Sequence, residues 1–246
     1  MLQVKHLKKQ FGGITAVNDC SFQVKPNTIT ALIGPNGAGK TTVFNLITGA
    51  STLDAGEIWM ESTPVHALPA FRRAQNLFSR TFQLNQVFLN MTVEENCLLA
   101  LDLHDQDFWK NLLGQERDEA SEKIQVQETL TLLGIAHQSQ VLASLCSYGQ
   151  QKLVGIARAL LLPHKMLLLD EPVAGVNPKL RTEIGSRLSE LRKRGETILV
   201  IEHDMEFVMS IADHVIVMSE GKVLKEGNPK EIQNDAEVLE IYLGKN

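Results

Sequence analysis

The nine residues 34–42, GPNGAGKTT, fit the pattern G-x-x-x-x-G-K-[ST]. They follow the apolar run TITALI, which predicts a buried strand, and they open a segment, residues 39–47, with helical periodicity. Glycines between a strand and a helix let backbone N–H groups curl around an anion, and the helix N-terminus adds a positive dipole end. The sequence therefore predicts an α/β fold with a phosphate site at the end of a strand.

Two side chains of this loop have specific expected roles. Lys40 supplies positive charge to the β- and γ-phosphates of a nucleotide, and the Thr41 hydroxyl can ligate Mg²⁺. The whole loop is expected to bind the nucleotide, that is, Gly34, Pro35, Asn36, Gly37, Ala38, Gly39, Lys40, Thr41 and Thr42.

A second segment, LLLDEP, places two carboxylates at the end of another apolar strand. Open α/β sheets bind their ligands at the carboxyl ends of such strands. Asp170 is expected to hold Mg²⁺ directly or through water, and Glu171 is positioned to polarise an attacking water. The alternative for Glu171 is a solvated acid that precedes Pro172 and leads a helix.

Two further residues are candidates for the same site. His203, in ILVIEHD, ends a buried strand, so it should project at the same sheet edge and reach the γ-phosphate or the water. A lone histidine after a strand is more often structural, but the shared edge favours a functional role here. Gln83, in SRTFQ, could join Mg²⁺ or the water to a moving part of the molecule, although the residue alone carries little information.

The order of the predicted elements indicates one domain, residues 1–246, with two lobes. A strand-rich start, a helical middle and a repeating α/β finish predict a mostly parallel core sheet with an N-terminal antiparallel β part. The core lobe is expected over about residues 1–83 and 149–246, and an inserted α-helical lobe over about 84–148. The most polar stretch, residues 104–123, reads as a surface insertion with no role that its residues indicate.

Composition limits the function classes. The net charge of −5 gives no sign of a general nucleic-acid surface. Three distant cysteines form no CxxC pair and no disulfide framework, which favours small buried cysteines in a reducing cytoplasm. No signal pattern opens the chain, and its apolar runs fall short of the roughly 20 residues that span a bilayer. Any role at a membrane would be peripheral.

The stretch SYGQQ has two possible functions. Ser147 followed by Gln150 is a capping box, which starts a helix. The same helix N-terminus could also bind an anion, for which Gly149 would allow close approach. The residues alone leave both readings open.

Together these motifs resemble the ATPase subunit of an ATP-binding-cassette (ABC) transporter, over essentially the whole chain. GPNGAGKTT resembles the family's Walker A motif, MLLLDEP its Walker B motif, TFQ its Q-loop, and His203 its switch histidine. The resemblance implies that Phe11 stacks on adenine, that Val17 belongs to the nucleotide site, and that Gln83 joins the Mg²⁺ ligands. The alternative for Phe11 is a core residue of an N-terminal strand.

The signature departs from the usual LSGGQ, because Cys146 and Tyr148 replace the leucine and the first glycine. Ser147, Gly149 and Gln150 remain, and the resemblance implies that they bind the nucleotide of an opposite chain. Asn177 stands where the family usually has aspartate, which weakens any charge-dependent contact across a dimer.

Within the family, TFQ, SYGQQ, DEPVAGVNP and VIEHDM look like the LivG-type subunits of branched-chain amino-acid importers. The resemblance implies ATP and Mg²⁺ as cofactors and a location on the cytoplasmic face of the inner membrane. It also implies a second ATPase subunit, either a copy or a LivF-like sister. Permease subunits would contact the helical lobe and the region after Gln83, residues 84–95.

Other functions remain open at this point. Another cargo, in urea or amide uptake or lipopolysaccharide export, would use much the same motifs. A soluble ABC ATPase acting on nucleic acid usually has tandem cassettes or a long coiled coil, and this chain has neither. A P-loop kinase or GTPase would leave the signature unexplained, and an inactive binding module would need the loss of Lys40, Glu171 or His203.

Overall fold

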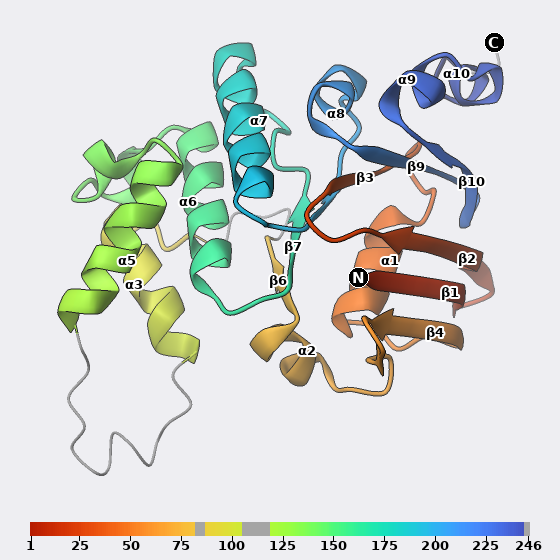
Figure 1. The fold of residues 1–246 in the computed structure, drawn as a ribbon, viewed down its shortest axis with the longest axis horizontal. Helices are drawn as coiled ribbons and strands as arrows, with labels where there is room; N and C mark the ends of the chain where they lie inside the picture. Colours follow the sequence, from red (N-terminus) through yellow and green to blue (C-terminus); the bar gives the residue numbers. More distant parts are fainter. Residues whose placement is uncertain (82–86, 105–118, 244–246) are drawn as a thin grey trace.

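The computed structural model describes residues 1–81, 87–104 and 119–243. Gln83, the start of the expected permease contact and most of the polar 104–123 segment lie outside the described residues. Figure 1 shows the chain as two sheets with helices around them.

The central sheet has six strands in the order β10-β9-β3-β8-β7-β6. All neighbours pair in parallel except β9 and β10, which are antiparallel. The prediction of a mostly parallel core sheet is confirmed. The strands are β3 (Ile29–Ile33), β6 (Phe78–Arg80), β7 (Met166–Asp170), β8 (Ile198–Ile201), β9 (His214–Ser219) and β10 (Lys222–Gly227).

A second sheet is antiparallel and comes from the N-terminal residues, as expected from their strand and turn pattern. Its order is β2-β1-β4-β5, and helix α1 lies beside it in Figure 1. Its strands are β1 (Leu2–Phe11), β2 (Ile14–Val24), β4 (Ala55–Met60) and β5 (Thr63–Pro64).

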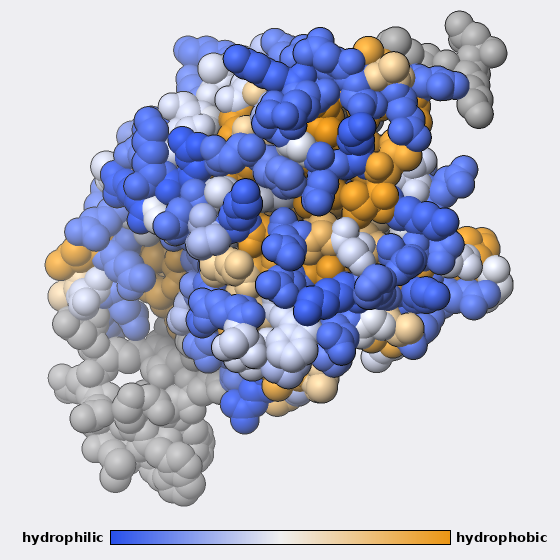
Figure 2. Space-filling model, turned by 45° about the vertical axis from the view of Figure 1, so that its right-hand side comes forward, coloured by the Kyte–Doolittle hydropathy of each residue, from blue (hydrophilic) through white to orange (hydrophobic). Residues whose placement is uncertain are grey.

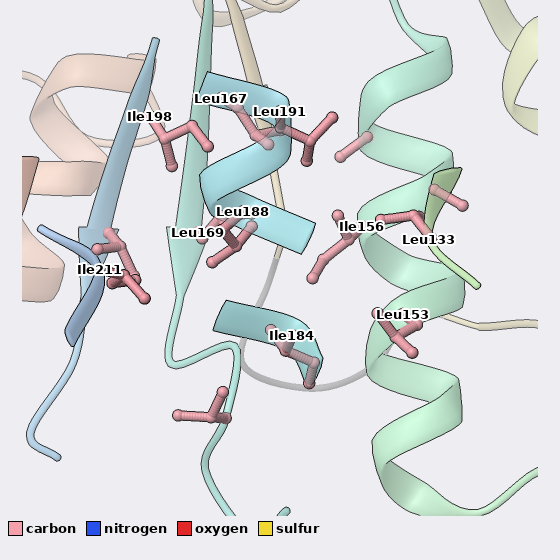
Figure 3. Close-up of a cluster of buried hydrophobic side chains, with 14 of the residues drawn as sticks. Leu133, Leu153, Ile156, Leu167, Leu169, Ile184, Leu188, Leu191, Ile198 and Ile211 are labelled. Atoms are coloured by element: carbon pink, nitrogen blue, oxygen red, sulfur yellow. The ribbon is translucent and has the colours of Figure 1, made fainter. Parts of the chain in front are cut away.

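The central strands are apolar throughout because both faces of the sheet are covered. In β7, Leu167 and Leu169 belong to one buried cluster and Met166 and Leu168 to the other. Figure 3 shows part of the first cluster, in which Leu167 and Leu169 lie beside Leu191 and Leu188 of helix α7. The second cluster contains buried side chains of α1 and of the antiparallel sheet. This alternation fixes the strand register, because a slip of one residue would exchange the two faces.

The helical middle of the sequence is also observed. Helices α3, α5 and α6 pack against one another (Figure 1), and α6 adds Leu153 and Ile156 to the cluster around α7. The division into two lobes stays a prediction. The helices are α1 (Lys40–Thr48), α2 (Ala70–Asn76), α3 (Val93–His104), α5 (Glu119–Leu132), α6 (Tyr148–Leu161), α7 (Pro178–Lys193), α8 (Met205–Ile211), α9 (Pro229–Gln233) and α10 (Ala236–Leu243).

The three cysteines, Cys20, Cys97 and Cys146, are buried and unbridged, as predicted. No helix in the described part of the chain combines the length and apolar character needed to cross a membrane. Figure 2 shows a face covered mainly by hydrophilic residues, with hydrophobic residues emerging in small groups.

Candidate nucleotide site

The phosphate loop joins β3 to α1, as the sequence predicts. Gly39 is the N-cap of α1 with a φ of 100°, and it makes no side-chain capping bond to the first N–H groups of the helix. A Cβ atom on Gly39 would lie 2.4 Å from the carbonyl oxygen of Ala16, so only glycine fits there. The first turn of α1 has no acidic side chain. The loop therefore presents unshared N–H donors and a positive dipole end to an anion.

Lys40 lies within this loop and is only 8% exposed. Its Nζ donates to the carbonyl oxygens of Gly34 and Pro35, at 2.7 and 2.9 Å. Burial lowers the pKa of the Lys40 ammonium, and the carboxylates of Glu171 and Asp170 oppose that shift. Strands β3 and β7 both pair in parallel with β8, so Lys40 and the two carboxylates follow strands that end at the same edge of the sheet, as predicted.

Asp170 ends β7 and is 2% exposed. Its Oδ2 accepts a hydrogen bond of 2.8 Å from Nη2 of Arg80, which ends β6, the strand paired with β7. Nη1 of Arg80 donates to Asn45 Oδ1 in α1 at 2.7 Å. Arg80 thus ties the Walker B strand to the helix that follows the phosphate loop. It was not among the predicted site residues, although a charged residue ending a short strand before TFQ is the signal that could have identified it.

The second oxygen of Asp170, Oδ1, is buried and has no hydrogen-bond partner within the described ranges. Carboxylate and hydroxyl oxygens are the ligands that Mg²⁺ prefers. A buried carboxylate oxygen left without a partner, in a site that also holds the exposed Thr41, fits a bound Mg²⁺ ion.

Glu171 and His203 come together as predicted. His203 Nδ1 lies 3.8 Å from Glu171 Oε1, and the His203 side chain is 58% exposed. Glu171 has a φ of 49°, which few residues other than glycine adopt. Its N–H donates to the carbonyl oxygen of Ile201 at 3.0 Å, so strand β8 holds the start of the turn.

Glu202, between β8 and His203, is a further residue that the sequence reasoning missed. It is fully buried, and its carboxylate accepts N–H bonds from Val173 at 3.0 Å and from His203 at 3.1 Å. Burial raises the pKa of the Glu202 carboxyl, against the effect of these bonds. A charged residue directly after the apolar run ILVI was the available signal. Glu202 joins the turn after Walker B to the start of the His203 segment.

Two residues of the N-terminal strands that are expected at the nucleotide site, Phe11 and Val17, differ in exposure. Phe11 ends β1 and is 48% exposed, and the Lys9 ammonium lies 5.2 Å from its ring centroid. It is therefore not the core phenylalanine of the alternative interpretation. Val17 in β2 is fully buried in the cluster around α1, so its side chain faces the core. Nucleotide contacts of both residues stay predictions.

The capping box at the signature is confirmed. Gln150 N donates to Ser147 Oγ at 3.3 Å, and Ser147 N donates to Gln150 Oε1 at 2.8 Å. A Cβ atom on Gly149 would lie 2.3 Å from Leu180 Cδ2, so this glycine allows α6 to approach α7 closely. Asn177 caps α7 by accepting from Leu180 N at 3.0 Å.

Comparisons with known proteins agree with this geometry. The family model described as ABC transporter matches residues 17–174. The chain is 37% identical to the high-affinity branched-chain amino acid transport ATP-binding protein BraF of Pseudomonas aeruginosa, covering 99% of this chain and 98% of the relative. It is 40% identical to the corresponding protein LivG of Salmonella typhimurium, with the same coverages.

A solved structure has the same fold. A nucleotide-free ATP-binding cassette from an ABC transporter superposes with a TM-score of 0.87 at 33% identity, covering 100% of this chain and 99% of that chain. The expected fold class is confirmed.

We expect the buried Arg80–Asp170 pair to contribute strongly to stability. Arg80→Met leaves the Asp170 carboxylate buried without its cation, so the free energy of unfolding should fall by about 3 kcal/mol in urea titrations. Lys165→Met is the control, because it breaks an exposed 2.7 Å pair with Glu61 and should cost less than about 1 kcal/mol. Equal losses in the two variants would contradict the assigned role of Arg80.

Proposed function

Because the chain belongs to the ABC transporter family, we propose that it is the ATP-hydrolysing subunit of an importer for branched-chain amino acids. The observation that carries the enzymatic part is the convergence of Lys40, Asp170, Glu171 and His203 at one edge of the central sheet.

The side chains divide the chemistry among them. Lys40 and the N–H groups of the loop bind the phosphates, and the charge of Lys40 stabilises the negative charge that develops on the transferred group. Glu171 accepts a proton from the attacking water, and His203 beside it holds the water or the γ-phosphate. Asp170 and Thr41, with Gln83, would hold Mg²⁺, which neutralises phosphate charge.

The complete site is proposed to need two chains. Ser147, Gly149 and Gln150 would close on a nucleotide held by the phosphate loop of the opposite chain. In support, the capping box fixes the start of α6, and Ser147 is exposed there. The partner is a second copy or a LivF-like sister. ATP would favour the closed pair, and hydrolysis would release it.

The proposed cargo and membrane partner are inferred from the relatives. The two named relatives are branched-chain amino acid transport ATP-binding proteins, and the chain matches nearly their whole length. The subunit would lie on the cytoplasmic face of the inner membrane and contact permease subunits through its helical lobe. Exposed Phe88 and Leu89, within the expected contact region 84–95, support such a contact. Uptake of urea or amides, lipopolysaccharide export and a soluble ABC ATPase remain the alternatives.

The role of Glu171 can be tested with Glu171→Gln, which keeps the shape of the side chain and removes the base. ATP turnover should fall at least about 100-fold, because a positioned base contributes roughly 10²–10⁴-fold. ATP binding should be retained, and an ATP-bound dimer should accumulate in size-exclusion chromatography. Glu61→Gln is the matched control, since Glu61 also has a positive φ, 58°, and pairs with Lys165 on the surface. Turnover unchanged in Glu171→Gln would rule out this base.

Transport and soluble function can be separated by purification. The full chain, expressed in its own host and extracted in mild detergent, should co-purify with an integral membrane protein. A charged replacement in the exposed patch, Leu89→Glu, should weaken that association because it places a charge in an apolar contact. Ile14→Glu, which places the same charge on an exposed isoleucine at the tip of the β1–β2 hairpin, is the control. Recovery of the chain with soluble partners alone would contradict the transport assignment.

A further inference from the structure

Lys152 lies on α6, five residues after Ser147, and belongs to none of the motifs assigned above. It is only 6% exposed, and its Nζ donates a hydrogen bond of 2.9 Å to the carbonyl oxygen of Glu171. A buried ammonium is costly to desolvate, so a lysine is retained inside a protein where its charge has a partner or a task.

The carbonyl that Lys152 binds belongs to a strained turn. Glu171 has a φ of 49° and precedes Pro172, and a following proline disfavours the helical regions of backbone space. Such a conformation persists only where its surroundings enforce it. Here the Glu171 N–H donates to the carbonyl oxygen of Ile201 at 3.0 Å. The carbonyl oxygen of Glu171 accepts from Lys152 Nζ and, at 3.3 Å, from the N–H of Ala174. Val173, two residues after Glu171, donates its N–H to the buried carboxylate of Glu202.

Tyr148, the residue that replaces the usual signature glycine, lies beside this lysine. The Lys152 ammonium is 5.5 Å from the centroid of the Tyr148 ring, a cation–π distance. The ring also lies close to Gly175, where an added Cβ atom would come within 3.2 Å of Tyr148 Cε1. Tyr148 therefore contacts both the lysine and the loop after β7, which gives the tyrosine at this position a physical role.

We propose that Lys152 is a positioning residue, which fixes the main chain of Glu171 and thereby aims the Glu171 carboxylate at the reacting water. The proposal rests on the function proposed above, in which Glu171 is the base. Because Ser147 caps α6, the helix that would meet the nucleotide of the opposite chain also supports the base of its own chain. When Ser147 closes on the nucleotide of the opposite chain, Lys152 on the same helix would transmit that movement to Glu171 of its own chain.

The test is the kinetics of Lys152→Met in the full chain. Small misplacements of a catalytic group can cost on the order of 100-fold in rate. We expect kcat for ATP to fall about 10- to 100-fold with KM and ATP affinity changed less than about two-fold, because Lys152 does not touch the nucleotide. Lys152→Arg, which keeps a buried donor, should restore most of the rate. The control Lys193→Met, at an exposed lysine of α7, should behave as the parent.

The same substitution in a Glu171→Gln background separates this proposal from the proposed function. If Lys152 acts through Glu171, then adding Lys152→Met to Glu171→Gln should lower the residual single-turnover rate by less than about two-fold. A full additional loss would show that Lys152 acts elsewhere and would overturn the proposal. Unchanged kcat in Lys152→Met, with Glu171→Gln inactive, would overturn it while leaving the base assigned. Full activity of Glu171→Gln would overturn both.

Discussion

Glu171 leaves strand β7 with a positive φ, a conformation that its own side chain and the proline that follows it both disfavour. The turn is held by a strand carbonyl, by the buried ammonium of Lys152 and by the buried carboxylate of Glu202. Together these contacts place the Glu171 carboxylate beside His203. The proposed chemistry depends on this constraint, because a base is useful only where its oxygen meets the water. The rest of the fold supports this turn through two elements. Strand β8 binds the N–H of Glu171, and helix α6 binds its carbonyl oxygen through Lys152.

Much of this arrangement was predictable from the sequence because it follows from the parallel sheet. Runs such as MLLLD and TILVI read as strands buried on both faces, and their carboxyl ends meet at one edge. That rule is sufficient to bring Glu171 and His203 together and to place Lys40 near them. The capping box at Ser147 was equally readable, because it depends on two residues three apart.

The supporting charges were not predicted, because the local signals at Arg80 and Glu202 do not say which distant groups these residues contact, and Lys152 has no local signal. Arg80, Lys152 and Glu202 are charged residues that become buried through contacts with distant segments, between 19 and 90 residues away in the chain. Sequence patterns assign such residues to the surface by default. Tyr148 is a similar case: its neighbours Lys152 and Gly175 come together only when α6 packs against the loop after Walker B.

In the proposed two-chain site, the phosphate loop and the signature of one chain bind different nucleotides. A structure of the full chain with Mg²⁺ and a non-hydrolysable ATP analogue tests it most directly. The two-chain site predicts that Lys40 Nζ leaves the carbonyl oxygens of Gly34 and Pro35 for the phosphates, while Ser147 contacts a nucleotide held by the other chain. Ser147 and Lys40 of the same chain on one nucleotide would contradict it.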